Sequence, residues 1–186
     1  MAALIAVPPQ VAAQSSDKPA PLTRAIEVRA DQVKDRTIEL TFSSEAPVQR
    51  WFGKEILDHN KKAARLDRLN DGAPVLFNHN MDDLRGVVEK AWIGQDKRGH
   101  AVIRLASNED GQKALDLIND NVLRNVSFMY RVLEWEQTKK EAEDGTYRVT
   151  DWEALEISLV TIPADQTVGI GRGLVRGFST EELEVK

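Results

Sequence analysis

Cysteine is absent from this 186-residue sequence. Its absence excludes a disulfide framework, a thiol nucleophile and a zinc site built on cysteine. No apolar run approaches the roughly 20 residues that a membrane-spanning helix requires, so we expect no membrane contact. Basic residues are also scarce, with 25 Lys and Arg against 30 Asp and Glu and a net charge of −5. A nucleic acid is therefore not expected as a partner, because phosphate binding needs clustered positive charge.

Three catalytic motifs are missing as well. The sequence has no G-x-S-x-G, which places the nucleophile of α/β-hydrolases, and no G-x-x-x-x-G-K-[ST] for nucleotide phosphates. It also lacks the zinc-protease motif H-E-x-x-H. His79 could bind a metal with Asp82 and Asp83, but three ligands within five residues would be cramped and no second His lies near. We therefore predict neither a metal nor another cofactor.

The length allows one domain with a proper core. We predict that residues 1–22 form a disordered arm, because they are rich in Ala, Pro, Gln and Ser and can bury little apolar surface. A secretory signal is disfavoured there, since no Lys or Arg precedes the apolar stretch and Pro8-Pro9 cuts it short. We place the domain at residues 23–170, and a flexible Gly-rich exit with an acidic tail at 171–186.

Apolar periodicity predicts many strands and one clear helix. Ile38, Leu40 and Phe42 alternate with polar residues, as expected for a strand with one buried face. The amphipathic pattern of residues 107–119 predicts a helix capped by Ser107. Further strands are expected at 73–77, 86–93, 100–106, 125–137 and 147–161, while 61–69 reads as a short helix or a basic loop. This order favours a β-barrel or sandwich with helical insertions.

Three separated segments carry residues suited to nucleophilic catalysis: PVLFNHN (74–80), LRNVSFMY (123–130) and ALEISLVTIPA (154–164). A serine hydroxyl needs an imidazole to take its proton, and the imidazole needs a group that orients it. Ser127, His79 and Glu156 could fill these roles. If Ser127 faces a cleft, Val126 and Phe128 point the other way into the core, because side chains alternate along a strand.

Each assignment has an ordinary alternative. Ser127 could be a small polar residue in a strand, and Glu156 could form an ion pair with Arg131 or Arg124. Ser158 is a weaker rival nucleophile, on the same strand face as Glu156. The two other histidines, His59 and His100, are expected to be solvated. The rivals of Glu156 as the acid are Asp58, Asp82 and Asp83.

These segments resemble the tailed-phage prohead (head maturation) proteases over residues 38–170. The resemblance rests on the L-F-N-H-N run, on V-S-F-M-Y after a predicted helix, and on E-I-S-L-V-T-I-P-A. Family members often have a small residue two positions after the nucleophile, where this chain has Met129. The resemblance implies a mainly β fold with helices: a single-domain β-barrel of the herpesvirus-protease type with one clear amphipathic helix.

The resemblance also implies an activity. It implies a serine endopeptidase with His79, Ser127 and Glu156 as catalytic residues. The implied substrates are the phage major capsid protein, the scaffold and finally the enzyme itself, within the assembling procapsid in the host cytoplasm. A homo-oligomer is compatible with it. Two alternatives stay open: a non-catalytic, scaffold-like assembly protein, and the protease domain of a protease-capsid polyprotein.

Overall fold

The computed structural model describes residues 22–27, 33–137 and 145–162. The predicted exit at 171–186, and all of the predicted arm except Leu22, lie outside the described residues. The elements are β1 (Leu22–Glu27), β2 (Val33–Lys34), β3 (Thr37–Ser44), β4 (Val48–Arg50), β5 (Gly53–Leu57), β6 (Ala64–Arg65), α2 (Asp67–Asn70), β7 (Pro74–Phe77), β8 (Asn80–Ile93), β9 (Arg98–Leu105), α3 (Glu109–Asn119), β10 (Asn125–Glu136) and β11 (Thr146–Val160).

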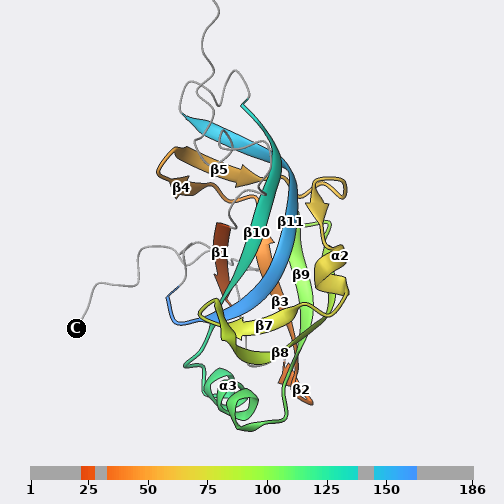
Figure 1. The fold of residues 1–186 in the computed structure, drawn as a ribbon, viewed down its shortest axis with the longest axis vertical. Helices are drawn as coiled ribbons and strands as arrows, with labels where there is room; N and C mark the ends of the chain where they lie inside the picture. The colour runs from red at the N-terminus through yellow and green to blue at the C-terminus, as the bar shows by residue number, and fades with distance from the viewer. Residues whose placement is uncertain (1–21, 28–32, 138–144, 163–186) are drawn as a thin grey trace, which may run out of the picture.

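The described strands belong to one mixed sheet, whose main path runs β1-β10-β11-β7-β8-β9-β3-β2. β10 and β11 form a long antiparallel hairpin that runs along the length of the molecule (Figure 1). β11 also pairs in parallel with β5, β6 and β7, so its whole length is bordered by other strands. The mainly β class with few helices is therefore confirmed.

Closure of this sheet into a barrel stays a prediction. The path of paired strands is open between β1 and β2, although β1 lies near β3. In the part of the chain that the structure describes, no ladder joins β1 to β3.

The predicted alternation is present in the strands that build the core. In β3, Ile38, Leu40 and Phe42 are buried, and the interposed Glu39 is exposed. In β10, Val126, Phe128 and Tyr130 point into the core. The rings of Phe42 and Phe128 meet edge to face at 5.2 Å between centroids, a favourable aromatic geometry. This packing fixes one face of β10 and turns the opposite face, with Ser127, toward the candidate site.

Helix α3 begins slightly later than the sequence predicts. The cap is Asn108 rather than Ser107, because the Asn108 side chain accepts a hydrogen bond of 2.9 Å from the Gly111 N–H. The helix buries its predicted apolar face, including Ala114, Leu115 and Ile118. Segment 61–69 forms neither a full helix nor a loop, but contains the short strand β6 and the start of α2.

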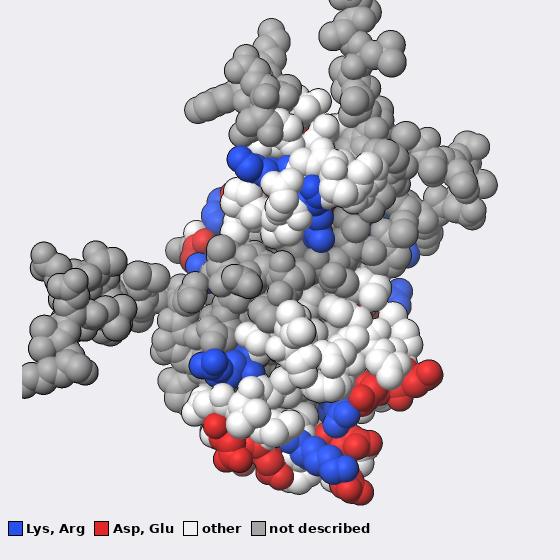
Figure 2. All heavy atoms as spheres, turned by 90° about the vertical axis from the view of Figure 1, so that its left-hand side faces the viewer, with Lys and Arg blue, Asp and Glu red and all other residues white. Residues whose placement is uncertain are grey.

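The surface of the described residues is unevenly charged. Figure 2 shows that acidic side chains, together with some Lys and Arg, gather at the lower end of the molecule, while further Lys and Arg side chains lie scattered higher up. Helix α3 carries Glu109, Asp110 and Asp116, with Lys113 bridging to Glu109 at 2.7 Å. Neither described helix is long and apolar enough to cross a membrane.

Candidate active site

His79 lies in a two-residue turn between β7 and β8, in which Phe77 pairs with Asn80. Both turn residues have positive φ, 50° for Asn78 and 59° for His79. A type I′ hairpin turn needs such values, which match the twist of the flanking strands. Positive φ is uncommon for residues other than Gly, although Asn and His adopt it more often than most. The turn therefore presents His79 in a conformation that the surrounding contacts must hold.

Those contacts come from the end of β11. The parallel pairing of β7 with β11 continues past Phe77, because the Asn78 N–H donates to the Leu159 carbonyl at 2.9 Å. The Asn78 side-chain oxygen in turn accepts the Thr161 N–H at 3.1 Å. The His79 N–H donates to the Ser158 hydroxyl at 3.1 Å. Three hydrogen bonds thus fix the turn to the end of β11 and to Thr161, the residue that follows the strand.

The three predicted residues meet in one hydrogen-bonded line. His79 Nδ1 lies 2.8 Å from Glu156 Oε1, and His79 Nε2 lies 2.9 Å from Ser127 Oγ. With Nδ1–H donating to the carboxylate, Nε2 is left as the acceptor for the serine O–H. Ser127 and Glu156 are each 2% exposed, and the imidazole is 23% exposed. The imidazole is thus partly exposed to solvent, while Ser127 and Glu156, its two hydrogen-bond partners, are buried in the sheet.

Strand register explains why these residues converge. Ser127 pairs with Ser158 across the β10–β11 ladder, and Met129 pairs with Glu156. Directly opposed residues in a sheet share a face, and so do residues two apart along one strand. Ser127 and Glu156 are therefore neighbours on one face, close enough for a single imidazole to bridge them.

Glu156 has partners for both oxygens. Oε1 faces His79, and Oε2 accepts the Ser158 hydroxyl at 2.7 Å. Such partners are needed because a buried carboxylate without hydrogen bonds is costly. The alternative ion pair with Arg131 is not formed, since Arg131 Nη1 binds Glu153 at 2.8 Å.

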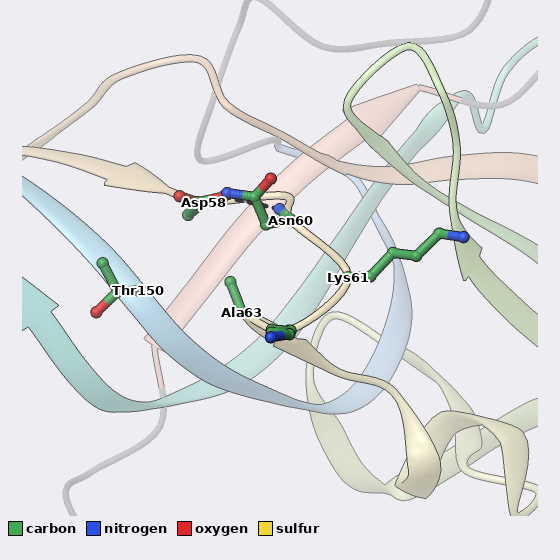
Figure 3. A pocket seen from close by; sticks show the side chains of 6 residues that line it. Asp58, Asn60, Lys61, Ala63 and Thr150 are labelled. Carbon is green, nitrogen blue, oxygen red and sulfur yellow. Dashed lines mark hydrogen bonds between the residues drawn. The ribbon is translucent and has the colours of Figure 1, made fainter.

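The rival acids lie elsewhere. Asp58 lines a hollow of about 570 Å³ together with Asn60, Lys61, Ala63 and Thr150, and none of the three bridged residues lines it (Figure 3). Asp83 forms an ion pair with Arg85 and accepts a hydrogen bond of 2.9 Å from Arg85 Nη2, and this hydrogen bond raises the pKa of Arg85. Asp82 is exposed in the first part of β8. Among the described residues, no group of three His, Cys, Asp or Glu side chains is placed to hold a metal ion.

The expectation that His59 is solvated is wrong. His59 is 1% exposed, with Nε2 at 2.8 Å from Ser43 Oγ and Nδ1 at 2.9 Å from the Leu57 carbonyl. It packs on Trp152, with ring centroids 5.4 Å apart. The polar neighbours in sequence concealed this burial, because the turn folds inward against β3. His100 is half-buried, stacked on Trp92 and hydrogen-bonded to Asp96.

Sequence reasoning missed the contributions of Asn78 and Ser158. Alternation placed Ser158 on the face of Glu156, but its contact with the His79 N–H depends on the parallel pairing of β7 and β11. That pairing joins segments about 80 residues apart, and no local pattern predicts it. Met129, the departure from the resembling family, lies opposite Glu156 and is partly exposed beside the site.

The line Glu156–His79–Ser127 has the hydrogen-bond order found in serine hydrolases, with acid, imidazole and hydroxyl in sequence. Comparison with known proteins identifies the protein family. Residues 28–180 match the family model described as caudovirus prohead serine protease. The chain therefore belongs to the prohead serine protease family of tailed phages.

Two individual proteins are similar to the chain. The major capsid protein of Halomonas phage phiHAP-1 is 39% identical over 144 residues, which are 76% of this chain and 24% of that protein. The chain thus spans about a quarter of that relative's length. The bacteriophage T4 capsid assembly protease, gp21, has a similar fold, with a TM-score of 0.58 and 13% identity. The match covers 79% of this chain and 100% of that structure.

Proposed function

We propose that the chain is a serine endopeptidase that cleaves proteins of the assembling phage head. The observation that carries this proposal is the buried Glu156 joined through His79 to Ser127 in a member of the prohead serine protease family. A carboxylate, an imidazole and a serine hydroxyl hydrogen-bonded in this order perform peptide hydrolysis on several unrelated folds.

The geometry supports the following mechanism. Ser127 Oγ attacks the scissile carbonyl carbon while His79 Nε2 takes its proton. The resulting imidazolium is stabilised by Glu156 through Nδ1–H. His79 then gives the proton to the leaving amine, so that the peptide C–N bond breaks and an ester on Ser127 remains. A water molecule, deprotonated by His79, hydrolyses this ester and restores the hydroxyl.

For substrates we propose the major capsid protein and the scaffold, followed by the enzyme itself, within a procapsid in the host cytoplasm. Support comes from the family description and from the relative's name, major capsid protein. A homo-oligomer and a herpesvirus-type barrel closed between β1 and β3 are further parts of this proposal.

The relative also favours a second arrangement. Since the chain matches 24% of a protein named major capsid protein, it could be the protease portion of a protease-capsid polyprotein. Its first cut would then separate the two parts. A non-catalytic assembly partner remains as the alternative from another class.

The test is co-expression with the capsid protein encoded beside this chain, or with the joined capsid segment if the reading frame continues. Intact masses are measured for wild type, Ser127→Ala and Glu156→Gln. We expect Ser127→Ala to lower the cleavage rate by about 10⁶-fold and Glu156→Gln by about 10⁴-fold, since Gln favours the wrong imidazole tautomer.

The control is Ser43→Ala, which also removes a buried serine hydroxyl bonded to a histidine, but away from the site. It should retain cleavage. If wild type and Ser127→Ala give the same masses while capsids still assemble, the assembly-partner alternative replaces the protease.

A further inference from the structure

We propose that Ser158 is a positioning residue that locks the base and the acid of the site into one geometry. This inference rests on the proposed function, because it assigns Ser158 a part in the same reaction. The hydroxyl is fully buried and lies between the two groups: it accepts the His79 N–H at 3.1 Å and donates to Glu156 Oε2 at 2.7 Å.

The two hydrogen bonds use the serine hydroxyl in a defined direction. A hydroxyl has one proton to donate and two lone pairs to accept with. Its proton goes to the carboxylate, so the oxygen faces the backbone N–H of His79. Rotation of Glu156 away from His79 would break the hydrogen bond between the Ser158 hydroxyl and Glu156. Movement of the turn would break the hydrogen bond between the His79 N–H and Ser158.

This lock matters because neither partner is held by conformation alone. His79 has a φ of 59°, which is uncommon for a residue with a side chain and persists only when its surroundings hold it. Glu156 has one oxygen for His79, and without Ser158 its other oxygen would lose the hydrogen bond that fixes the carboxylate plane. Catalytic groups must be held closely in place, because small displacements cost large factors in rate.

Ser43 provides a matched comparison within the chain. It is also fully buried, and its hydroxyl lies 2.8 Å from a histidine nitrogen, His59 Nε2. Substitution of either serine by Ala removes a buried hydroxyl that is hydrogen-bonded to a histidine. Ser158→Ala also removes the hydrogen bond to the buried Glu156 carboxylate, so it should cost more stability than Ser43→Ala. Only Ser158→Ala disturbs the base and the acid, and the two rates are compared at equal folded fraction.

The experiment measures the rate at which a fluorophosphonate probe labels the full chain, together with the proton spectrum of the imidazole N–H groups. The probe reads the nucleophile without requiring a known protein substrate. The expected result is that Ser158→Ala lowers the labelling rate by about 10- to 100-fold, the effect of losing a hydrogen bond to a charged group. Ser43→Ala should stay within about twofold at equal folded fraction.

The spectroscopic readout follows the Nδ1–H of His79. In wild type we expect a downfield resonance that disappears in His79→Gln, and in Ser158→Ala this resonance should move or broaden. Ser158→Thr, which keeps the hydroxyl, should restore part of the labelling rate. If Ser158→Ala does not fold, Ser158→Cys takes its place, since a thiol fills the space but donates only weakly.

The outcomes separate this inference from the proposed function. If wild type is labelled, and Ser158→Ala matches Ser43→Ala in both rate and resonance, the positioning role is wrong and the protease proposal stands. If wild type is not labelled, the protease proposal fails. The part of Ser158 in the reaction then fails with it: a displaced resonance in Ser158→Ala would show only that Ser158 holds the His79–Glu156 geometry, and an unchanged one would overturn that as well.

Discussion

At the residue scale, the turn that carries His79 must satisfy both the proposed catalytic geometry and the limits of its own backbone. The turn places His79 above the sheet face that bears Ser127 and Glu156, but it requires positive φ at both of its residues. Left-handed backbone costs a residue with a side chain about 1–2 kcal/mol. Asn78 reduces this cost, because its short polar side chain tolerates the region and bonds to the Thr161 N–H.

At Asn78 we predict that a Gly variant is more stable than an Ala variant, the reverse of the usual order in a helix. Asn78→Gly should lose the bond to Thr161 but keep the easy positive φ, whereas Asn78→Ala should lose both. We expect Asn78→Ala to be less stable than Asn78→Gly by about 1 kcal/mol. Urea unfolding of both variants measures this difference. The same pair at Asn119, an exposed residue of α3, should show the opposite order, because a helix favours Ala. An Asn78→Ala variant as stable as Asn78→Gly would contradict the strained-turn explanation.

Individual residues differ in how far the sequence reveals them. His79, Ser127 and Glu156 were predicted from their flanking segments, and the structure brings them within hydrogen-bonding distance. The sequence indicates Ser158 only as a rival nucleophile, because its contact with the turn depends on tertiary pairing. The solvated position predicted for His59 is wrong, because a polar run of residues can still fold inward when its histidine forms hydrogen bonds with a hydroxyl and a carbonyl group.

At the element scale, the strands with clear alternation were predicted within one or two residues. The first part of β8 was missed, and the strand begins at Asn80 rather than Gly86. The reason is physical: two irregularities interrupt its pairing with β7, so Met81, Asp82 and Leu84 are exposed and the segment lacks strict alternation. The part of β8 that the sequence does not predict follows directly after His79, and it therefore lies next to the candidate site.

Helix α3 gives a prediction at this scale. Gly to Ala normally stabilises a helix by about 0.5–1 kcal/mol. At Gly111, however, a Cβ atom would lie 2.1 Å from the Ala106 carbonyl oxygen. We therefore expect Gly111→Ala to destabilise the protein by about 1–3 kcal/mol, as overpacking does. Thermal or urea unfolding tests it, with the exposed Asp116→Ala as a control expected to stay within about 0.5 kcal/mol. A stabilised Gly111→Ala variant would show that α3 can move away from residue 106.

At the scale of the whole molecule, composition and periodicity predicted a single mainly β unit with one amphipathic helix. They did not predict the order of strands. β11 receives parallel partners from β5, β6 and β7, and antiparallel pairing from β10. Each pairing depends on contacts between segments that lie far apart in the sequence, and the strand propensity of a single segment does not predict its partner. The candidate site exists only because of this order, since β7, β10 and β11 each supply one part of it or its immediate anchor.

The central claim is that this fold makes one serine a nucleophile. The most direct measurement is to treat the full chain with a fluorophosphonate, digest it and locate the modified residue by mass spectrometry. The serine oxygen displaces fluoride and forms a stable phosphorus ester, so the adduct marks the activated hydroxyl. Of the eight serines in the sequence, we predict modification of Ser127 alone, and its loss in His79→Gln. A folded wild type that stays unmodified, or carries the adduct on Ser158 or another serine, would contradict the account.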